Sequence, residues 1–199
     1  MGSPRRVISF HKVSDMHTNS QTGQLLHDDH HRTIDLLNVF EAYLQRTPED
    51  DVPTLDVDGR ALLATLGKEL GQDLERHFIL EEQGLFPPIA TAGAYEMTAD
   101  LEADHEALRP LVRRLARLCA LALREGFDEE SWPVFRHFGH QLIDGLVLHI
   151  QKEETALLSA VDDVLTPAQD VTLASAYSQG EDWFADLGDH TPSLNVQGA

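Results

Sequence analysis

Apolar residues recur every three or four positions over four long stretches of this chain. In the first stretch, Leu26, Ile34 and Leu37 fall on one side of a helix, and this spacing is typical of an amphipathic helix that packs against a core. The same spacing predicts four long helices, at residues 21–46, 56–83, 95–125 and 129–165. No stretch has the two-residue alternation of a strand. We therefore expect an all-α protein that folds as an up-down-up-down four-helix bundle.

Glycine and proline indicate where these helices end. Gly84 stands where a helix C-cap belongs, and Pro87 and Pro88 are expected to stop the second helix there. Thr166 and Pro167 predict the start of a short extra C-terminal helix. The expected organisation is a mobile N-terminal arm, one helical bundle, a C-terminal helix and a disordered tail, at residues 1–20, 21–165, 166–187 and 188–199.

The charge of the chain is strongly negative. Its 199 residues include 34 acidic and 15 basic side chains, for a formal net charge of -19, which argues against binding to nucleic acid or to an anionic membrane surface. No apolar run is long enough to span a membrane, and the first residues lack the apolar core of a signal peptide. With one cysteine, Cys119, the chain alone forms neither an internal disulfide nor a thiolate metal site. We expect a cytoplasmic protein.

Several of the 11 histidines fall on the inner faces of the predicted helices. His77 and Glu81 are four residues apart, so on a helix they share one face and can bind one metal ion. His149 and Glu153 repeat this spacing in the fourth helix. With one histidine each from the first and third helices, the candidate metal ligands are His30, His77, Glu81, His105, His149 and Glu153. Four imidazoles and two carboxylates suit a pair of iron or manganese ions in a four-helix bundle.

The roles of some neighbouring residues stay open at this point. His27 and His31 lie within one helical turn of the candidate in the first helix, so either is an alternative ligand. Glu82 is expected to face solvent, although a carboxylate at this position can also support a ligand histidine. Asp73 lies one turn before His77, where it either orients that imidazole or lies at the surface.

The segment from His77 to Pro87, His-Phe-Ile-Leu-Glu-Glu-Gln-Gly-Leu-Phe-Pro, resembles the His-x-x-x-Glu-Glu-x-x-Leu-Phe-Pro segment of the hemerythrin-like, or HHE cation-binding, family. Asp-Asp-His30 and Leu-Glu-Ala-Asp-His105-Glu-Ala-Leu resemble the corresponding segments of the first and third helices, and the likeness covers about residues 22–165. It implies a four-helix bundle that holds a non-haem di-iron centre. It also implies the roles of the ligands, which are terminal for His30, His77, His105 and His149 and bridging for Glu81 and Glu153.

The chain is more similar to some members of this family than to others. Oxygen-carrying hemerythrins have two histidines four residues apart in the third helix, whereas Arg109 follows His105 at that spacing here. Their fourth helix supplies an aspartate where this chain has Glu153. Four histidines and two glutamates instead resemble the di-iron domain of the iron-cluster repair proteins and the iron-sensing hemerythrin domain of a ubiquitin-ligase subunit. These differences argue against reversible oxygen transport.

The ligand set also limits the chemistry. Two imidazoles per metal and two shared carboxylates give each ion four protein ligands, which leaves room for an oxo or hydroxo bridge and for one open position. Iron is the expected metal, although manganese and zinc accept the same ligands. We expect a protein that binds, senses or scavenges dioxygen, nitric oxide, peroxide or iron, with a role in oxidative stress. The alternative is a di-iron enzyme with peroxidase-like, catalase-like or oxidase activity.

A third interpretation has no metal and treats the histidines as ordinary core residues. Glu81 and Glu153 would then be buried at a cost on the order of several kcal/mol, unless they were protonated or paired.

Overall fold

The computed structural model describes residues 18–48 and 51–179, and all regular secondary structure within them is helical. This confirms the predicted all-α class. Helix α1 (Gln21–Arg46) begins after Ser20, whose side chain accepts a hydrogen bond from the backbone N–H of Gly23. Helix α5 (Tyr95–Glu125) ends at Gly126, which has a φ of 81°. Both helices have the predicted bounds.

The second helical segment continues beyond its predicted end at residue 83. Its successive elements are α2 (Val57–Lys68), η1 (Glu69–Asp73), α3 (Leu74–Ile79), η2 (Leu80–Leu85), α4 (Phe86–Ile89) and η3 (Ala90–Ala94), where η denotes a π-helix. The prediction that Gly84 and the two following prolines stop the helix is wrong. The prolines occupy the first turn of α4, where a backbone N–H is not needed. The glycine that breaks the helix is Gly93, with a φ of 111°.

The fourth segment is also composite, and it is followed by a short helix. Its elements are α6 (Ser131–Lys152), η4 (Glu153–Leu157) and α7 (Leu158–Val164), after which comes α8 (Pro167–Gln179). Residues 180–187 of the predicted C-terminal helix, the predicted tail 188–199, and residues 1–17 of the predicted arm lie outside the described residues. The remaining arm residues contact the bundle, because the Thr18 hydroxyl and the Ser20 N–H donate to Asp162 at 2.6 and 2.9 Å.

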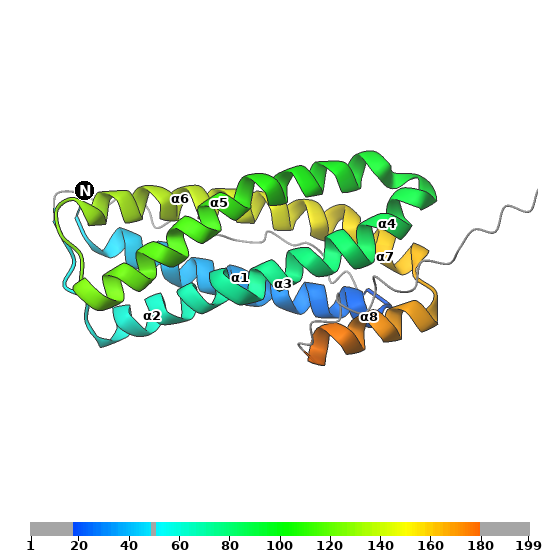
Figure 1. Cartoon of the computed structure of the whole chain (residues 1–199), viewed down its shortest axis with the longest axis horizontal. Coiled ribbons are helices and arrows are strands. Elements are labelled where there is room, and N and C mark those ends of the chain that lie inside the picture. The colour runs from blue at the N-terminus through cyan, green and yellow to red at the C-terminus, as the bar shows by residue number, and fades with distance from the viewer. Residues whose placement is uncertain (1–17, 49–50, 180–199) are drawn as a thin grey trace, which may run out of the picture.

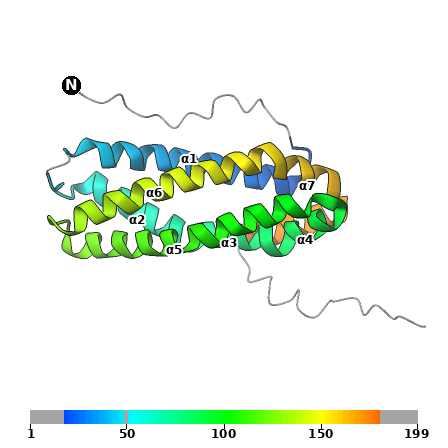
Figure 2. The same ribbon diagram turned by 90° about the horizontal axis from the view of Figure 1, so that it is seen from above.

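The long segments lie side by side (Figures 1 and 2). Helix α1 packs against α6 and α2, and α5 packs against the same two helices, so the contacts form a closed ring. Helix α8 lies against α1 at one end of the molecule (Figure 1). Among the described residues, no helix is long and apolar enough to cross a membrane.

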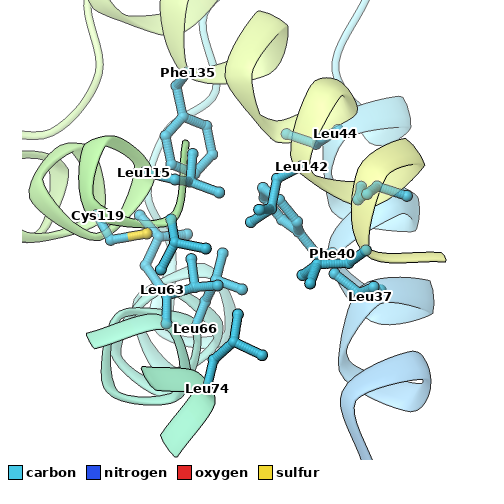
Figure 3. Close-up of a cluster of buried hydrophobic side chains, with 14 of the residues drawn as sticks. Leu37, Phe40, Leu44, Leu63, Leu66, Leu74, Leu115, Cys119, Phe135 and Leu142 are labelled. Atoms are coloured by element: carbon cyan, nitrogen blue, oxygen red, sulfur yellow. The ribbon is translucent and has the colours of Figure 1, made fainter. Parts of the chain in front are cut away.

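Apolar side chains form two clusters along the bundle. The larger one, part of which is shown in Figure 3, contains Phe40, Phe135 and Leu142 and fills the half near the α1–α2 connection. The smaller one contains Leu26 and Leu157 and lies toward α8. Along the chain, His30, His105 and Glu153 each fall between a member of the larger cluster and a member of the smaller one, so a polar layer lies where the two clusters meet.

We predict that Gly139→Val lowers the free energy of unfolding by about 1–3 kcal/mol, because an added side chain forces α1 and α6 apart. A Cβ at Gly139 would lie 2.8 Å from Leu44 Cδ1 and 2.9 Å from Phe40 Cζ. Urea denaturation measures the change. Gly71→Ala is the control, since a Cβ there meets nothing within 4 Å and alanine favours a helix by up to about 1 kcal/mol. Wild-type stability of Gly139→Val would contradict the close packing.

Candidate metal centre

The structure brings the six predicted ligands together in the polar layer, and all six are buried. They form two groups whose ligand atoms lie within 4.8 Å of one another: His30, His77, Glu81 and Glu153 in the first, and Glu81, His105, His149 and Glu153 in the second. The two glutamates belong to both groups. The first helix contributes His30 and neither of its two neighbouring histidines. Metal binding by these residues stays a prediction.

The separations within each group suit the coordination of a single ion. The Nε2 atoms of His30 and His77 are 3.3 Å apart, and those of His105 and His149 are 3.0 Å apart. Two ligands that bind one ion at right angles, each at about 2.1 Å, lie about 3 Å from each other. The nearest carboxylate oxygens of Glu153 lie 3.0 Å from His30 Nε2 and 2.8 Å from His149 Nε2. The donor atoms are therefore close enough to share ions.

The two shared glutamates are electrostatically unbalanced. Glu81 and Glu153 are fully buried, and none of their four carboxylate oxygens accepts a hydrogen bond. Within residues 18–48 and 51–179, their only ion-pair partners within 4 Å are histidines. A buried carboxylate without a partner is costly, so these oxygens require either cations or protonated imidazoles beside them. The donor set therefore fits metal ions.

A further carboxylate faces the outer nitrogen, Nδ1, of each candidate histidine ligand. The pairs are His30 with Glu154 at 2.6 Å, His105 with Glu82 at 2.7 Å, His149 with Asp104 at 3.4 Å and His77 with Asp29 at 3.7 Å. The first three are hydrogen-bond distances and the fourth is a longer ionic contact. A carboxylate at Nδ1 holds the ring proton there and leaves the Nε2 lone pair directed at the centre. This tautomer is the one that a metal ion requires.

These outer carboxylates connect the helical segments in a closed order. Each one belongs to a residue that directly precedes or follows a candidate ligand in the chain. The first segment supplies the carboxylate for the histidine of the second, the second for the third, the third for the fourth, and the fourth for the first. Each imidazole is therefore oriented by a neighbouring helix.

The structure shows the contacts of two residues whose roles the sequence left open. Glu82 does not simply face solvent, because it accepts hydrogen bonds from His105 and, at 2.9 and 3.0 Å, from both terminal nitrogens of Arg109. Asp73 does not orient His77, since it accepts a hydrogen bond from Lys68 at 2.8 Å. The carboxylate of Asp29 faces His77 instead.

Both shared glutamates stand in π-helical turns, which the sequence pattern did not indicate. The N–H of Phe86 donates to the carbonyl of Glu81, and the N–H of Leu158 donates to the carbonyl of Glu153, each five residues earlier. Such turns contain an extra residue and often occur at functional sites. The wider turn at η4 allows Glu153 and its neighbour Glu154 to be buried together.

A cavity of about 270 Å³ reaches the centre from the surface beside α1 and α3. Buried His30 and His77 line its inner end, and exposed Arg32 and Lys68 line its outer end. Tyr177 of α8 also lines it and donates a hydrogen bond to Asp29. Burial raises the pKa of Tyr177 to about 12, so the hydroxyl keeps its proton at neutral pH.

A family of known proteins matches most of this chain. The model of the hemerythrin HHE cation-binding domain matches residues 22–168, which is more than half of the chain and includes all six candidate ligands. A search of curated proteins gave no match.

The pKa values of the metal-free histidines lead to a prediction about protons. Burial lowers the pKa of His105, but the negative carboxylates of Glu153 and Glu81 beside the ring outweigh burial and raise it to about 9. Burial also lowers the pKa values of His30 and His77, but nearby carboxylates produce a net rise. These are chiefly Glu153 and Glu154 at His30 and Glu81 and Glu153 at His77. At pH 7 the His105 imidazole therefore holds a proton that a metal ion must displace.

We predict that adding Zn²⁺ to the metal-free protein at pH 7 releases at least one proton per chain, detected with an indicator dye in weak buffer. The release should decrease as the starting pH is raised through 9, because His105 is then already neutral. His105→Ala should release about one proton fewer than the wild type at pH 7. Equal release at pH 7 and above pH 9 would contradict the raised pKa.

Proposed function

Because this chain belongs to the hemerythrin HHE cation-binding domain family, we propose that it holds two iron ions and uses them to bind, sense or scavenge a small ligand. Dioxygen, nitric oxide and peroxide are ligands of this kind, and iron itself is another candidate. The observation that carries the proposal is the pair of buried carboxylates, Glu81 and Glu153, which accept no hydrogen bond and belong to two ligand groups at once.

The candidate ligands form two sets, and each set would hold one ion. His30 and His77 would hold one ion and His105 and His149 the other. The shared glutamates would contact both ions and balance part of their charge. Bound iron would supply open coordination positions and a change of oxidation state. The outer carboxylates keep each Nε2 directed inward before any ion arrives, so an ion that displaces a proton from Nε2 binds with little movement of the rings.

The proposal includes the up-down-up-down order of the four segments. In Figure 1 the colour gradient reverses direction between successive segments, which supports this order. The break at Gly93 separates the second segment from the third, and residues 126–130 connect the third to the fourth, so both connections are short, as such a bundle requires.

The size of the cavity supports a small ligand. A water molecule occupies about 30 Å³ in the liquid, so a cavity of about 270 Å³ accommodates dioxygen, nitric oxide or peroxide together with several waters. Its outer end is lined by acidic and basic side chains, among them Arg32, Lys68 and Glu69. Such a lining disfavours extended apolar substrates.

We predict about two irons per chain for protein purified without oxygen and supplied with Fe²⁺, measured by elemental analysis. His77→Ala should lose at least one of them, because it removes a ligand from one group, while circular dichroism shows that the helices persist. His137→Ala, which removes an exposed histidine from α6, is the matched control and should keep both irons. Full iron content in His77→Ala would show that the assigned ligands are wrong.

One observation favours the enzyme alternative. The hydroxyl of Tyr177 donates to Asp29, and Asp29 faces Nδ1 of His77, so a chain of polar groups leads from the cavity wall to a candidate ligand. General acid–base catalysis needs a proton donor near the reacting ligand, and Tyr177 holds its proton at neutral pH.

If the protein is an enzyme, we predict that the iron-loaded form consumes hydrogen peroxide over many turnovers, well above free Fe²⁺ at equal concentration. Tyr177→Phe should then lower the rate by about 100-fold or more, the usual contribution of a positioned proton donor, with unchanged iron content. Tyr95→Phe, at a tyrosine that is 68% exposed, is the control. A stoichiometric colour change without turnover would instead support a protein that only binds or senses the ligand.

A further inference from the structure

A third pair of imidazoles lies outside the buried centre. His27 and His31 are one helical turn apart on α1, and their Nε2 atoms are 3.1 Å from each other. The side chain of His27 is 24% exposed, and His31 lies at the surface. Neither residue belongs to the two buried groups.

The geometry of this exposed pair matches that of the buried pairs. Its Nε2 separation of 3.1 Å falls between the 3.0 and 3.3 Å of the two imidazole pairs in the centre. Two ligands at right angles on one ion, at about 2.1 Å each, have this separation. The ring planes meet at 79° with centroids 4.4 Å apart, so the rings are not stacked and their edges meet.

Glu154 contacts Nδ1 of His27 and thereby orients its ring, as it also does for His30. Both carboxylate oxygens of Glu154 lie close to His27 Nδ1, at 2.9 and 3.1 Å, and Oε1 also lies 2.6 Å from His30 Nδ1. The side chain of Glu154 is only 3% exposed. It therefore holds the ring proton of His27 at Nδ1 and leaves the Nε2 lone pair directed toward His31.

We propose that His27 and His31 form a separate surface site for one divalent transition-metal ion of the kind that prefers imidazole, such as Zn²⁺. Two imidazoles four residues apart on a helix bind such an ion from one face, and water completes the coordination. In the metal-free protein the His31 Nε2–H donates to His27 Nε2. When the ion binds, His31 gives that proton to solvent and takes one at Nδ1, so it stays neutral.

The exposed site does not depend on the proposed function, but Glu154 connects the two. The same carboxylate orients His27 in the exposed pair and His30 in the buried centre. An ion on His27 strengthens the Nδ1–H donor and draws the Glu154 carboxylate toward that ring. An ion at the surface site therefore weakens the hydrogen bond between His30 and Glu154.

Equilibrium dialysis against a fixed concentration of free Zn²⁺, followed by elemental analysis, tests the site on the full chain. His31→Gln and His27→Gln should each bind one zinc fewer per chain than the wild type. His137→Gln, at an exposed histidine on α6, should bind as much zinc as the wild type. If both His31→Gln and His27→Gln bind as much zinc as the wild type, the surface site does not exist.

A second comparison separates this proposal from the buried centre. His77→Ala damages the centre and leaves the surface pair intact, so adding His31→Gln to it should still remove one zinc. That difference is expected even if the buried residues bind no metal at all. Histidine ¹⁵N spectra of the wild type give an independent measurement, because zinc should shift the Nε2 signals of both residues. Unchanged signals at saturating zinc would overturn the proposal.

Discussion

Two negative charges at the centre of the bundle are the constraint on which the rest of the structure depends. The carboxylates of Glu81 and Glu153 are removed from water and accept no hydrogen bond, so their charge must be balanced by something beside them. Four imidazoles occupy the adjacent positions and bring no permanent charge of their own. The centre is therefore stable in one of two states, with protons on the imidazoles or with cations among them.

Around this centre, charge alternates outward in layers. The inner carboxylates are surrounded by the imidazoles, and the imidazoles by the outer carboxylates. Basic side chains then pair with the outer carboxylates, as Arg109 does with Glu82 and Lys152 with Asp104. The apolar clusters on both sides keep the local dielectric constant low, which strengthens each of these contacts. The polar layer is consequently rigid although it interrupts the core.

The sequence was sufficient for the parts of this arrangement that depend on helical spacing. The pairs His77–Glu81 and His149–Glu153 face inward as four-residue spacing requires, and the bounds of α1 and α5 follow from the apolar pattern. The continuation through Gly84 could not be predicted, because a π-turn changes the period without a residue signature. The role of Glu82 and the pairing of Asp29 with His77 depend on how neighbouring helices are rotated against each other, which a single helix pattern does not contain.

The closed order of the outer carboxylates has a consequence for how such a protein can evolve. Each imidazole is oriented by a carboxylate on another segment. The four pairs are His77 with Asp29, His105 with Glu82, His149 with Asp104, and His30 with Glu154. A substitution at one member leaves the other with an unpaired ring nitrogen or carboxylate. Among related sequences the members of each pair should therefore change together, and a lineage that abandons the metal centre should lose the eight positions as a group.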